Sequence, residues 1–333
     1  MRKIFIVTGA NGFLGNNIVR ELSKTHEVRA LILPNDKYHI LKDMNCKIYY
    51  GDVTKPETLE QIFFTAADEE LYVIHCAAIV YIKSKYNPNV YNVNVNGTKN
   101  IIQKVLEKNA KLIYVSSVHA ITEKPNKEVI TEIKDFNPDA VIGYYAKTKA
   151  ETAQYVLKMV EEKNLNACII HPSGIIGPND YSSTHLTQLL IDYANKKLTA
   201  CVNGGYDFVD VRDVVNGIIK ACKYGKKGEC YILSNQYITV KELLDIASGV
   251  LKIKKIKTIL PMWFAKLTAP LSELYYYLAK HPPLYTKYSL YTLISNSNFS
   301  NLKAKKELGY TTRDIKETVK DTIQWLKEEK KIK

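Results

Sequence analysis

The chain has 333 residues, 46% of them hydrophobic, and a net charge of +13; this length suits about two domains and the composition is typical of globular proteins. Only five of its 47 basic residues are Arg, and the Lys residues are scattered, which argues against nucleic acid as a partner. The six Cys show no CxxC pair and no ligand-like spacing with His, so we expect buried thiols in a reducing compartment and no metal site. We find neither a secretory leader nor an apolar run of about 18 residues, and we expect a cytoplasmic protein without a membrane span.

Residues 1–15 predict a strand, a glycine turn and the start of a helix. Residues 4–7 form a short apolar run typical of a buried strand, and apolar residues recur at helical spacing after residue 15. Between them, Gly9 permits a tight turn, Gly12 lets the backbone approach a phosphate, and Gly15 lets the helix pack closely on the strand. This arrangement places the pyrophosphate of a dinucleotide on backbone N–H groups at a helix N-terminus.

The rest of the first half alternates between apolar strands and helices. We expect helices at about 90–108 and at 144–163. Further strands are expected at 28–33, 47–50, 72–75, 111–115, 167–170, 208–213 and 229–233. Near-continuous apolar strands with intervening helices indicate a doubly wound parallel sheet, an α/β fold of the Rossmann type, covered on both faces. Such sheets bind ligands beyond the carboxyl ends of their strands.

After residue 175 the pattern loosens, which predicts a second, smaller and mostly helical domain. We assign residues 1–175 to a dinucleotide-binding domain, to which the segment 206–235 returns. The substrate-binding domain then consists of 176–205 and 236–333. Within it, residues 255–299 are rich in aromatic and aliphatic side chains and suggest an apolar lid.

Tyr145 and Lys149 lie four residues apart on the predicted helix 144–163, so they share one face. A nearby ammonium favours the phenolate and lowers the pKa of a phenol, which lets the pair exchange a proton with an alcohol or ketone near neutral pH. The chain contains six Tyr-x-x-x-Lys pairs, so the motif alone is weak. Position selects Tyr145, because its helix follows the strand that ends in Ser116 and Ser117.

Together these motifs resemble the extended short-chain dehydrogenase/reductases, also called the NAD-dependent epimerase/dehydratase family, over essentially the whole chain. The matching motifs are Thr8–Gly15 as TGxxGxxG, Asn94–Thr98 as NVxGT, Val115–Ser117 as the strand end with the catalytic Ser, His171–Pro178 as RPxxxxGP with His for the usual Arg, and Phe208–Asp213 as a later substrate-domain motif. The resemblance implies that Tyr145 is the general acid/base and that Lys149 lowers its pKa and holds the nicotinamide ribose. It also implies that Ser117 bonds the substrate oxygen, with Ser116 as the alternative.

The resemblance also implies a cofactor site at the strand ends. Its residues are Gly9, Asn11, Gly12, Phe13, Leu14, Gly15, Leu33, Asp36, Asp52, Val53, Cys76, Ala77, Ala78, Asn94, Tyr145, Lys149, Pro172 and Gly174. NAD is distinguished from NADP at the end of the second strand, where an acidic residue takes the ribose 2′-OH and a basic one the 2′-phosphate. Leu33 fits neither pattern. Asp36 favours NAD, while Lys37 beside it leaves NADP open.

Four residues are candidate substrate contacts: Ser117, His119, Asn179 and Arg212. Arg212 has a second interpretation, in which it joins Asp210 and Asp213 in pinning the substrate domain to the sheet. The resemblance further implies a homodimer formed through the helix that holds Tyr145.

Three functions remain open. Residues 28–31 and 208–214 resemble the dihydroflavonol-reductase and 3β-hydroxysteroid-dehydrogenase branch, and the apolar lid suits an apolar or aromatic substrate; this favours a dehydrogenase or reductase acting on a secondary alcohol or ketone. A nucleotide-sugar epimerase or dehydratase with tightly bound NAD would need Arg or Lys for a diphosphate; the second half contains only two Arg, Arg212 and Arg313, although Lys could serve instead. A non-catalytic dinucleotide sensor is disfavoured by the intact set of Ser117, Tyr145 and Lys149.

Overall fold

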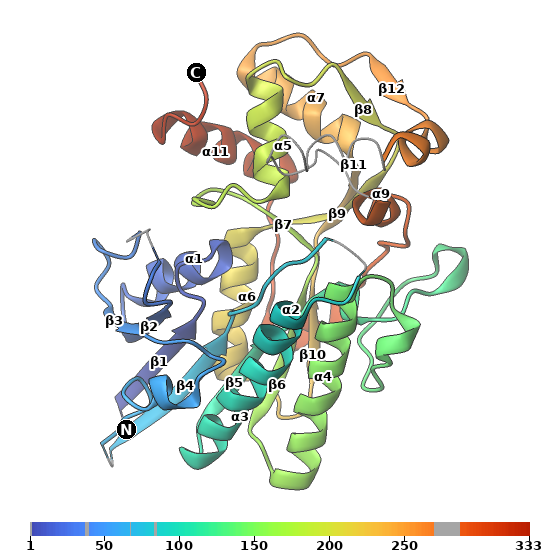
Figure 1. The fold of residues 1–333 in the computed structure, drawn as a ribbon. Helices are drawn as coiled ribbons and strands as arrows, with labels where there is room; N and C mark the ends of the chain where they lie inside the picture. Colours follow the sequence, from blue (N-terminus) through green and yellow to red (C-terminus); the bar gives the residue numbers. More distant parts are fainter. Residues whose placement is uncertain (1, 37–39, 67, 83–84, 270–286) are drawn as a thin grey trace.

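A central sheet of seven parallel strands organises the protein (Figure 1). The computed structural model describes residues 2–36, 40–66, 68–82, 85–269 and 287–333. In spatial order the strands are β10 (Cys230–Leu233), β6 (Ala167–Pro172), β5 (Lys111–Val115), β4 (Glu69–His75), β1 (Arg2–Thr8), β2 (Glu27–Ile32) and β3 (Lys47–Tyr50). The order reverses between β1 and β4, so this is the doubly wound Rossmann sheet that the sequence predicts.

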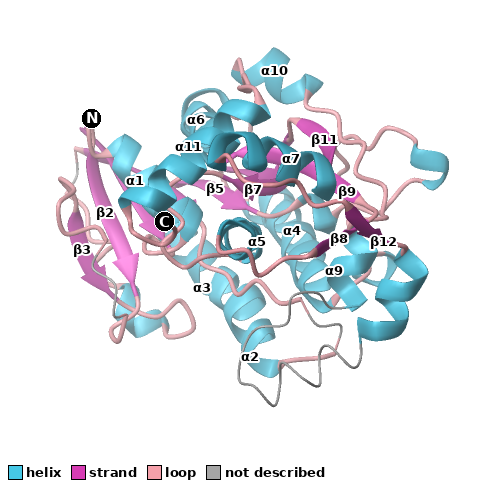
Figure 2. Ribbon diagram, turned by 90° about the horizontal axis from the view of Figure 1, so that it is seen from above, coloured by secondary structure: helices cyan, strands magenta, loops and turns pink. Residues whose placement is uncertain are grey.

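Alternate residues of the strands pack into two separate clusters on opposite faces of the sheet. In β1, Ile4 and Ile6 belong to the cluster shared with α3 (Gly97–Glu107) and α4 (Tyr144–Lys163). Phe5 and Val7 belong to the cluster shared with α1 (Phe13–Leu22) and α6 (Val211–Tyr224). Figure 2 shows these helix pairs on the two sides of the sheet. Each fully buried aliphatic side chain contributes about 1.5–3 kcal/mol relative to an exposed one, so both faces stabilise the sheet.

The helix predicted at about 90–108 is interrupted near its start. It begins as α2 (Pro88–Tyr91), passes through one π-helical segment at Asn92–Asn96, and continues as α3. The side chain of Asn94 is buried in this segment and makes two hydrogen bonds with the backbone of Ile79. Asn94 Oδ1 accepts from Ile79 N at 2.8 Å, and Asn94 Nδ2 donates to Ile79 O at 3.1 Å. Single π turns of this kind are frequent at functional sites.

The second half contains helices and also two small sheets. The sequence analysis did not predict these two sheets. One has three strands, β11 (Gln236–Thr239), β9 (Gly205–Asp210) and β7 (Gly174–Ile176), and the other pairs β12 (Thr258–Leu260) with β8 (Ala200–Val202). The helices here are α5 (His185–Ala194), α7 (Val240–Leu251), α9 (Lys287–Thr292), α10 (Leu302–Leu308) and α11 (Ile315–Glu328). In Figure 1 most of these elements form a lobe above the carboxyl ends of the main sheet.

The segment around Phe208 does not return to the main sheet as expected. The chain leaves that sheet at Pro172 and enters β7 almost at once, and β9 pairs with β7 and β11 instead. Only β10 of the returning segment joins the main sheet, beside β6, while α6 covers its face. The second lobe is therefore joined to the Rossmann part by the β7–β9 pair.

Three other expectations concern the whole chain. All six Cys lie in the described ranges and are free; four are buried as predicted, whereas Cys46 and Cys76 are partly exposed. Within the described part of the chain, no helix is long and apolar enough to span a bilayer. Residues 270–286 of the expected lid lie outside the described residues.

Candidate active site

The glycine turn between β1 and α1 has the close packing that the motif predicts. Gly9 has φ of +63°, and a Cβ there would lie 2.8 Å from the backbone of Ala77. A Cβ at Gly15 would lie 2.1 Å from the carbonyl oxygen of Gly9. The turn is closed by a hydrogen bond from Gly12 N to Gly9 O at 3.0 Å. Only glycine fits these positions without moving the turn.

The N-terminus of α1 fits an anionic group. Gly12 is its N-cap and offers no side-chain oxygen, and the first turn of the helix carries no acidic residue. The side chain of Asn11, in the turn itself, has a buried Oδ1 without a hydrogen-bond partner among the described residues. Free N–H groups at a helix start attract phosphates, so this cradle fits the pyrophosphate of NAD.

His75, which the sequence analysis passed over, ties the strand ends beneath the cradle together. Thr98 Oγ1 donates to Asn94 O at 2.7 Å, so it accepts from His75 Nε2 at 2.9 Å. His75 Nδ1 then accepts from Thr8 Oγ1 at 2.6 Å, and Thr8 in turn accepts from Ala77 N at 3.2 Å. Burial lowers the pKa of His75 to about 3, so the ring is neutral and acts as a structural link. It fixes the loop of Cys76 to Ala78 against Gly9.

The cofactor-specificity positions lie at the ends of β2 and β3. Leu33 is 54% exposed and its carbonyl accepts from Asp36 N at 3.1 Å, while Lys37 lies outside the described residues. Asp52 Oδ1 accepts from the backbone N and the hydroxyl of Thr54, at 2.9 and 2.8 Å. Val53 next to it is buried. The choice between NAD and NADP at Asp36 stays a prediction.

The three predicted catalytic residues come from β5 and α4. Ser117 follows β5 and accepts from His119 N at 3.2 Å as the cap of a short 3-10 turn. Tyr145 lies in the first turn of α4, and Lys149 one turn later is 3% exposed. Lys149 Nζ donates to Val115 O at 2.8 Å and lies 5.9 Å from the centre of the Tyr145 ring. The end of β5 and the start of α4 therefore bring all three residues to one edge of the sheet.

At this edge of the sheet, burial is the main influence on the pKa values of Tyr145 and Lys149. Burial raises the pKa of Tyr145 well above its usual value, with Tyr288 adding to the rise and Ser117 opposing it. Burial also lowers the pKa of Lys149 to about 8. That Lys149 lowers the pKa of Tyr145 stays a prediction. Lys149 Nζ donates to Val115 O, and burial dominates the pKa of both side chains in this arrangement. Tyr145 is therefore held as the neutral phenol, a proton donor.

Two tyrosines that the sequence analysis did not select enclose His119 on the substrate side. The ring of Tyr206, on β9, stacks on His119 with centroids 5.5 Å apart, and its hydroxyl lies 3.4 Å from Nε2. Tyr288, on α9, lies 6.1 Å from His119 between ring centroids. It packs onto Gly143, where φ is +98° and a Cβ would lie 2.2 Å from the ring. Burial lowers the pKa of His119 to about 4, so this cluster is uncharged near neutral pH.

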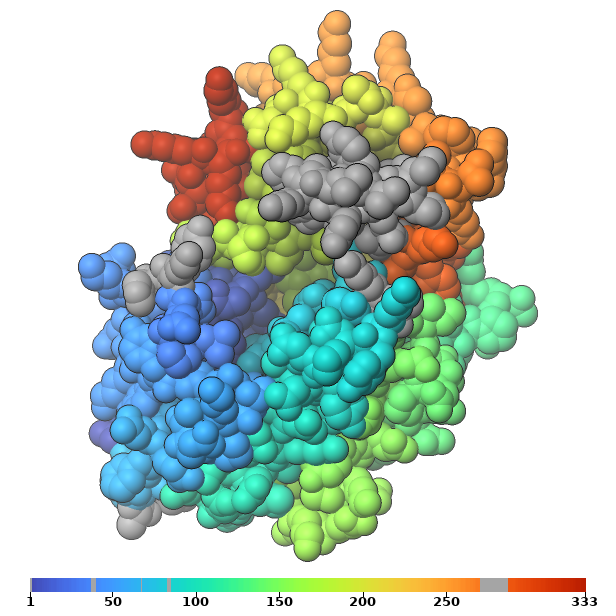
Figure 3. Space-filling model, in the orientation of Figure 1, coloured from blue at the N-terminus to red at the C-terminus, as the bar shows by residue number. Residues whose placement is uncertain are grey.

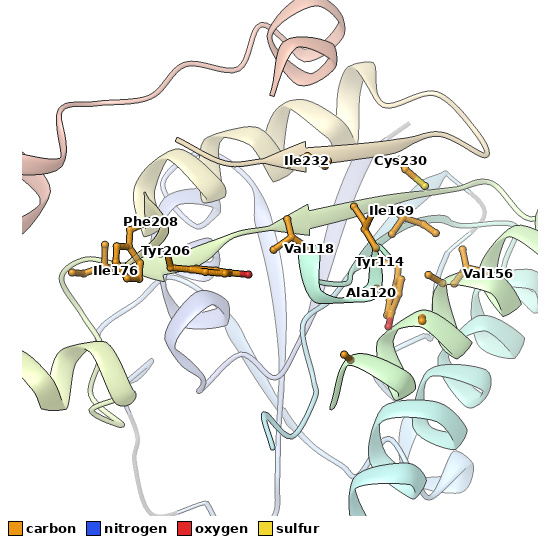
Figure 4. Packing of buried hydrophobic residues seen from close by; sticks show 14 of the residues in the cluster. Tyr114, Val118, Ala120, Val156, Ile169, Ile176, Tyr206, Phe208, Cys230 and Ile232 are labelled. Atoms are coloured by element: carbon orange, nitrogen blue, oxygen red, sulfur yellow. The ribbon is translucent and has the colours of Figure 1, made fainter. Parts of the chain in front are cut away.

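Beside His119 lies a pocket of about 200 Å³. Its lining is Val118, His119, Ile121, Glu123, Ile130, Ala140, Val141, Ile142, Tyr206, Tyr291, Ser295, Asn296 and Phe299. In Figure 4 the ring of Tyr206 extends from β9 toward Val118. None of the described lining residues is Arg or Lys, and Glu123 accepts a hydrogen bond from the Tyr291 hydroxyl. Most of the lining side chains are thus aliphatic or aromatic, while Glu123, Ser295 and Asn296 add polar groups.

Asn179 and Arg212, two predicted substrate contacts, are bonded to protein groups. Asn179 Nδ2 donates to Asn17 Oδ1 at 3.0 Å, which holds its loop on α1. Arg212 donates twice to Asp210, at 2.9 and 2.7 Å, and once to Asp321 of α11 at 2.7 Å. These contacts correspond to the pinning role considered for Arg212. Contact of either residue with a substrate stays a prediction.

His171 replaces the usual Arg at the end of β6 and supports Ser117 from behind. It is fully buried, Nδ1 donates to Ser117 O at 2.9 Å, and the ring stacks on Phe136 with centroids 5.4 Å apart. Burial lowers its pKa to about 4, so the ring is neutral. Beyond it, Pro172 ends β6 and Gly174 begins β7. The His fixes the backbone of the residue that is expected to bond the substrate oxygen.

With this geometry in place, comparisons with known proteins define the class. Residues 5–234 match the model of the NAD dependent epimerase/dehydratase family, and the chain belongs to that family. It is therefore an enzyme of the extended short-chain dehydrogenase/reductase type, for which NAD is the family cofactor.

One relative and one solved structure span nearly the whole chain, and a second relative spans about three quarters of it. A Synechocystis sp. protein named "Putative dihydroflavonol 4-reductase" is 27% identical over 331 residues, 98% of this chain and 95% of the relative. A UDP-glucose 4-epimerase of Halalkalibacterium halodurans is 27% identical over 271 residues, 74% of this chain and 79% of the relative. The crystal structure of gox2253 superposes with a TM-score of 0.84 at 31% identity and covers 99% of both chains. The expected resemblance to reductases of this family is confirmed.

Proposed function

We propose that the protein is a dehydrogenase or reductase that interconverts a secondary alcohol and a ketone on an apolar or aromatic substrate. The observation that carries the proposal is the convergence of Ser117, Tyr145 and Lys149 beside an aromatic pocket without Arg or Lys in its described lining. Val118 and His119, which follow Ser117 directly in the chain, line that pocket, so a substrate that extends from the pocket past these residues would bring its carbonyl toward Ser117 and Tyr145.

In this proposal the side chains divide the proton chemistry among them. Tyr145 Oη carries the proton that passes to the substrate oxygen during reduction and takes it back during oxidation. Ser117 donates a hydrogen bond to the same oxygen, and its backbone is fixed by His171. Lys149, bonded to Val115 O, holds the nicotinamide ribose. NAD, when bound, accepts the hydride or, in its reduced form, supplies it.

The cluster of His119, Tyr206 and Tyr288 is the specificity surface of the proposal. Stacked rings present flat apolar faces to a substrate, while the Tyr206 hydroxyl offers one polar group. The relative named as a dihydroflavonol reductase supports a substrate with a ring system. Asp36 supports NAD over NADP as cosubstrate.

A nucleotide-sugar epimerase with tightly bound NAD is the second candidate. The similarity to a UDP-glucose 4-epimerase favours it. A diphosphate substrate needs cations, and Arg212 and Arg313 are engaged with Asp210, Asp213 and Asp321. The aromatic pocket lining therefore favours the reductase.

The first experiment separates these two candidates. The full chain is purified without added nucleotide and denatured, and any released dinucleotide is identified. Stoichiometric retained NAD together with turnover of a UDP-sugar would replace the proposal by the epimerase. An exchangeable site, with NADH or NADPH oxidised by alicyclic or aryl ketones, supports the reductase, and the tighter dinucleotide names the cosubstrate.

Two further parts of the proposal concern the protein as a whole. We propose a homodimer formed through α4, as the family resemblance implies, and a cytoplasmic location. Light scattering of the purified chain tests the dimer, and a Tyr155→Glu variant on the outer face of α4 should shift it toward monomer.

A further inference from the structure

Residues 252–267 expose apolar and basic side chains together, and we call them the 252–267 surface. Five Lys occur here, and no Asp or Glu lies between residues 252 and 269. Large apolar side chains are exposed beside them: Ile259 43%, Trp263 68%, Phe264 39% and Leu267 69%. The Lys residues are Lys252, Lys254, Lys255, Lys257 and Lys266, all exposed. The rings of Trp263 and Phe264 contact each other with centroids 5.8 Å apart, and several large apolar side chains exposed within one short stretch suggest an interaction site.

The helical segment 262–269 buries its small residues and exposes large apolar ones, which is the reverse of an ordinary surface helix. Its small residues Ala265 and Ala269 are fully buried and pack with Leu290 of α9. Trp263 and Leu267, four residues apart and therefore on one face, point away from the protein and are 68% and 69% exposed. A helix that served only to cover the core would bury its large apolar residues. The outer face is therefore built to contact something else.

The Lys residues of this surface have little compensation from the protein. Among the described residues, Asp245 lies within ion-pair distance of one of them, Lys255, at 3.9 Å. The stretch lies along the outer edge of the upper lobe, away from the main sheet, in the orange part of the chain (Figure 1). In the space-filling view, orange side chains project beyond the body of that lobe (Figure 3). The surface thus offers uncompensated positive charge next to exposed apolar groups.

We propose that the 252–267 surface binds reversibly to a lipid bilayer that carries anionic headgroups. Exposed Trp, Phe and Leu side chains combined with Lys residues are the features that place a segment in the headgroup boundary, where Trp is favoured; here Trp263, Phe264 and Leu267 lie on the helical segment, and four of the five Lys precede it in the chain. The lysines contact the lipid phosphates. A single-stranded nucleic acid could use the lysines and stack on Trp263, but it would leave the aliphatic Leu267 and Ile259 exposed, so the combination favours a bilayer.

The surface shares an element with the substrate side of the enzyme. Leu290, which packs against Ala265 and Ala269, belongs to α9. The same helix carries Tyr288 beside His119 and Tyr291 in the pocket lining. A bilayer bound here would lie next to the element that borders the pocket. The binding proposal does not depend on the proposed reaction, because it is tested by binding alone.

The test uses the two Trp residues of the chain as internal probes. Trp325 is 7% exposed and far more shielded than Trp263. A Trp325→Phe variant of the full chain is titrated with phosphatidylcholine vesicles, with and without phosphatidylglycerol, and binding is also measured by vesicle sedimentation. We expect co-sedimentation and a blue shift of Trp263 emission with the anionic vesicles only. No sedimentation, or sedimentation without a shift, overturns the proposal.

Matched variants localise the binding. Leu267→Ser is compared with Leu302→Ser, whose Leu is 71% exposed on α10. Lys254→Gln/Lys257→Gln is compared with Lys305→Gln/Lys306→Gln, which removes the same charge elsewhere. Each Lys near an anionic surface contributes roughly fivefold in affinity, so we expect the 254/257 pair to weaken binding by more than about tenfold. If both double variants lost the same affinity for the vesicles, binding would depend on net charge alone, and the proposal that the 252–267 surface binds the bilayer would be refuted. Unchanged melting temperatures confirm that the variants fold.

Discussion

The glycine turn and the His119 cluster are two halves of the candidate active site, and they are built in different ways. The turn is specified by residues 8–15, and its geometry follows from backbone contacts such as Gly15 against Gly9 O. The His119 cluster joins rings from the end of β5, from β9 and from α9, and residues 119 and 206 are 87 positions apart. The first is a local backbone structure, and the second depends on how the two lobes are joined.

In the proposed function, the first half holds the cofactor common to the family and the second contacts the substrate. A backbone cradle accepts any ligand with the same phosphates, so its sequence is constrained by sterics alone. An aromatic cluster from distant segments can change ring by ring without disturbing the cradle. We therefore expect substitutions on the two sides to have separable effects on cofactor and substrate.

The largest effect is expected at Tyr145, where the two halves meet. Tyr145→Phe removes the proton donor, and general acid–base catalysis contributes about 10²–10⁴-fold, so kcat should fall by that factor. The dinucleotide affinity should change less than about twofold. Steady-state kinetics and dinucleotide titration measure both. Tyr144→Phe, one residue earlier on α4, is the control and should retain turnover; undiminished turnover in the Tyr145 variant would refute the catalytic assignment.

A Cβ at Gly15 should damage the cradle and spare the His119 cluster. In Gly15→Ala the methyl group would lie 2.1 Å from Gly9 O, and overpacking of this kind costs about 1–3 kcal/mol in stability. We expect a lower melting temperature and weaker dinucleotide binding. Gly249→Ala on α7 has nothing within 4 Å of the added Cβ and should gain up to about 1 kcal/mol. Normal dinucleotide binding by the Gly15 variant would contradict the packing described.

The sequence pattern correctly predicted those helices, strands and turns whose structure depends on residues close together in the chain. The helix 144–163 has the predicted bounds, because Gly143 and Asn164 at its ends take positive φ of +98° and +57°. The apolar runs of β1 and β5 predicted strands because both of their faces are buried. The glycine spacing predicted the turn for the steric reasons given above.

The sequence could not predict features that depend on contacts between distant segments. Three strands of the second half, β7, β8 and β12, have three residues each, too few for a periodic pattern. The spacing of Tyr145 and Lys149 places both on one helix face, but not Lys149 Nζ on Val115 O. Tyr206 and Tyr288 are ordinary members of a chain with 24 Tyr, and nothing near them in sequence points to His119.

Acid should destabilise both halves through buried histidines. Burial lowers the pKa of His75, under the cradle, to about 3 and of His171, behind Ser117, to about 4, from 6.5. Between those values and 6.5 the unfolded chain binds protons that the folded chain does not, so stability is present above pH 6.5 and is lost as the pH falls. Each His contributes up to about 1.4 kcal/mol per pH unit. Burial raises the pKa of Asp207 to about 6, so this carboxyl binds a proton more readily in the folded chain. Its effect on stability therefore offsets the acid loss caused by one of the histidines.

Melting temperatures between about pH 7 and about pH 5 measure this loss. His75→Gln and His171→Gln each remove one titrating group, so each should flatten the dependence of stability on pH by a similar amount. His185→Gln is the control, because that side chain is less buried and its pKa is lowered less. A dependence that persists in full in both variants would show that other groups govern acid stability.

The smallest effect, and the one that decides whether the halves are separable, is expected for Tyr206→Phe. The substitution keeps the ring stacked on His119 and removes only the hydroxyl that lies 3.4 Å from Nε2. In the proposed function this hydroxyl also bonds the substrate, and one such hydrogen bond contributes about 0.5–1.5 kcal/mol, so KM for the substrate should rise roughly twofold to tenfold while kcat and the dinucleotide affinity stay constant. Tyr224→Phe, on the exposed part of α6, is the control. If the dinucleotide affinity fell with KM, the aromatic cluster would be coupled to the cradle through the Ser117 turn, and substrate recognition would not be an independent property of the second lobe.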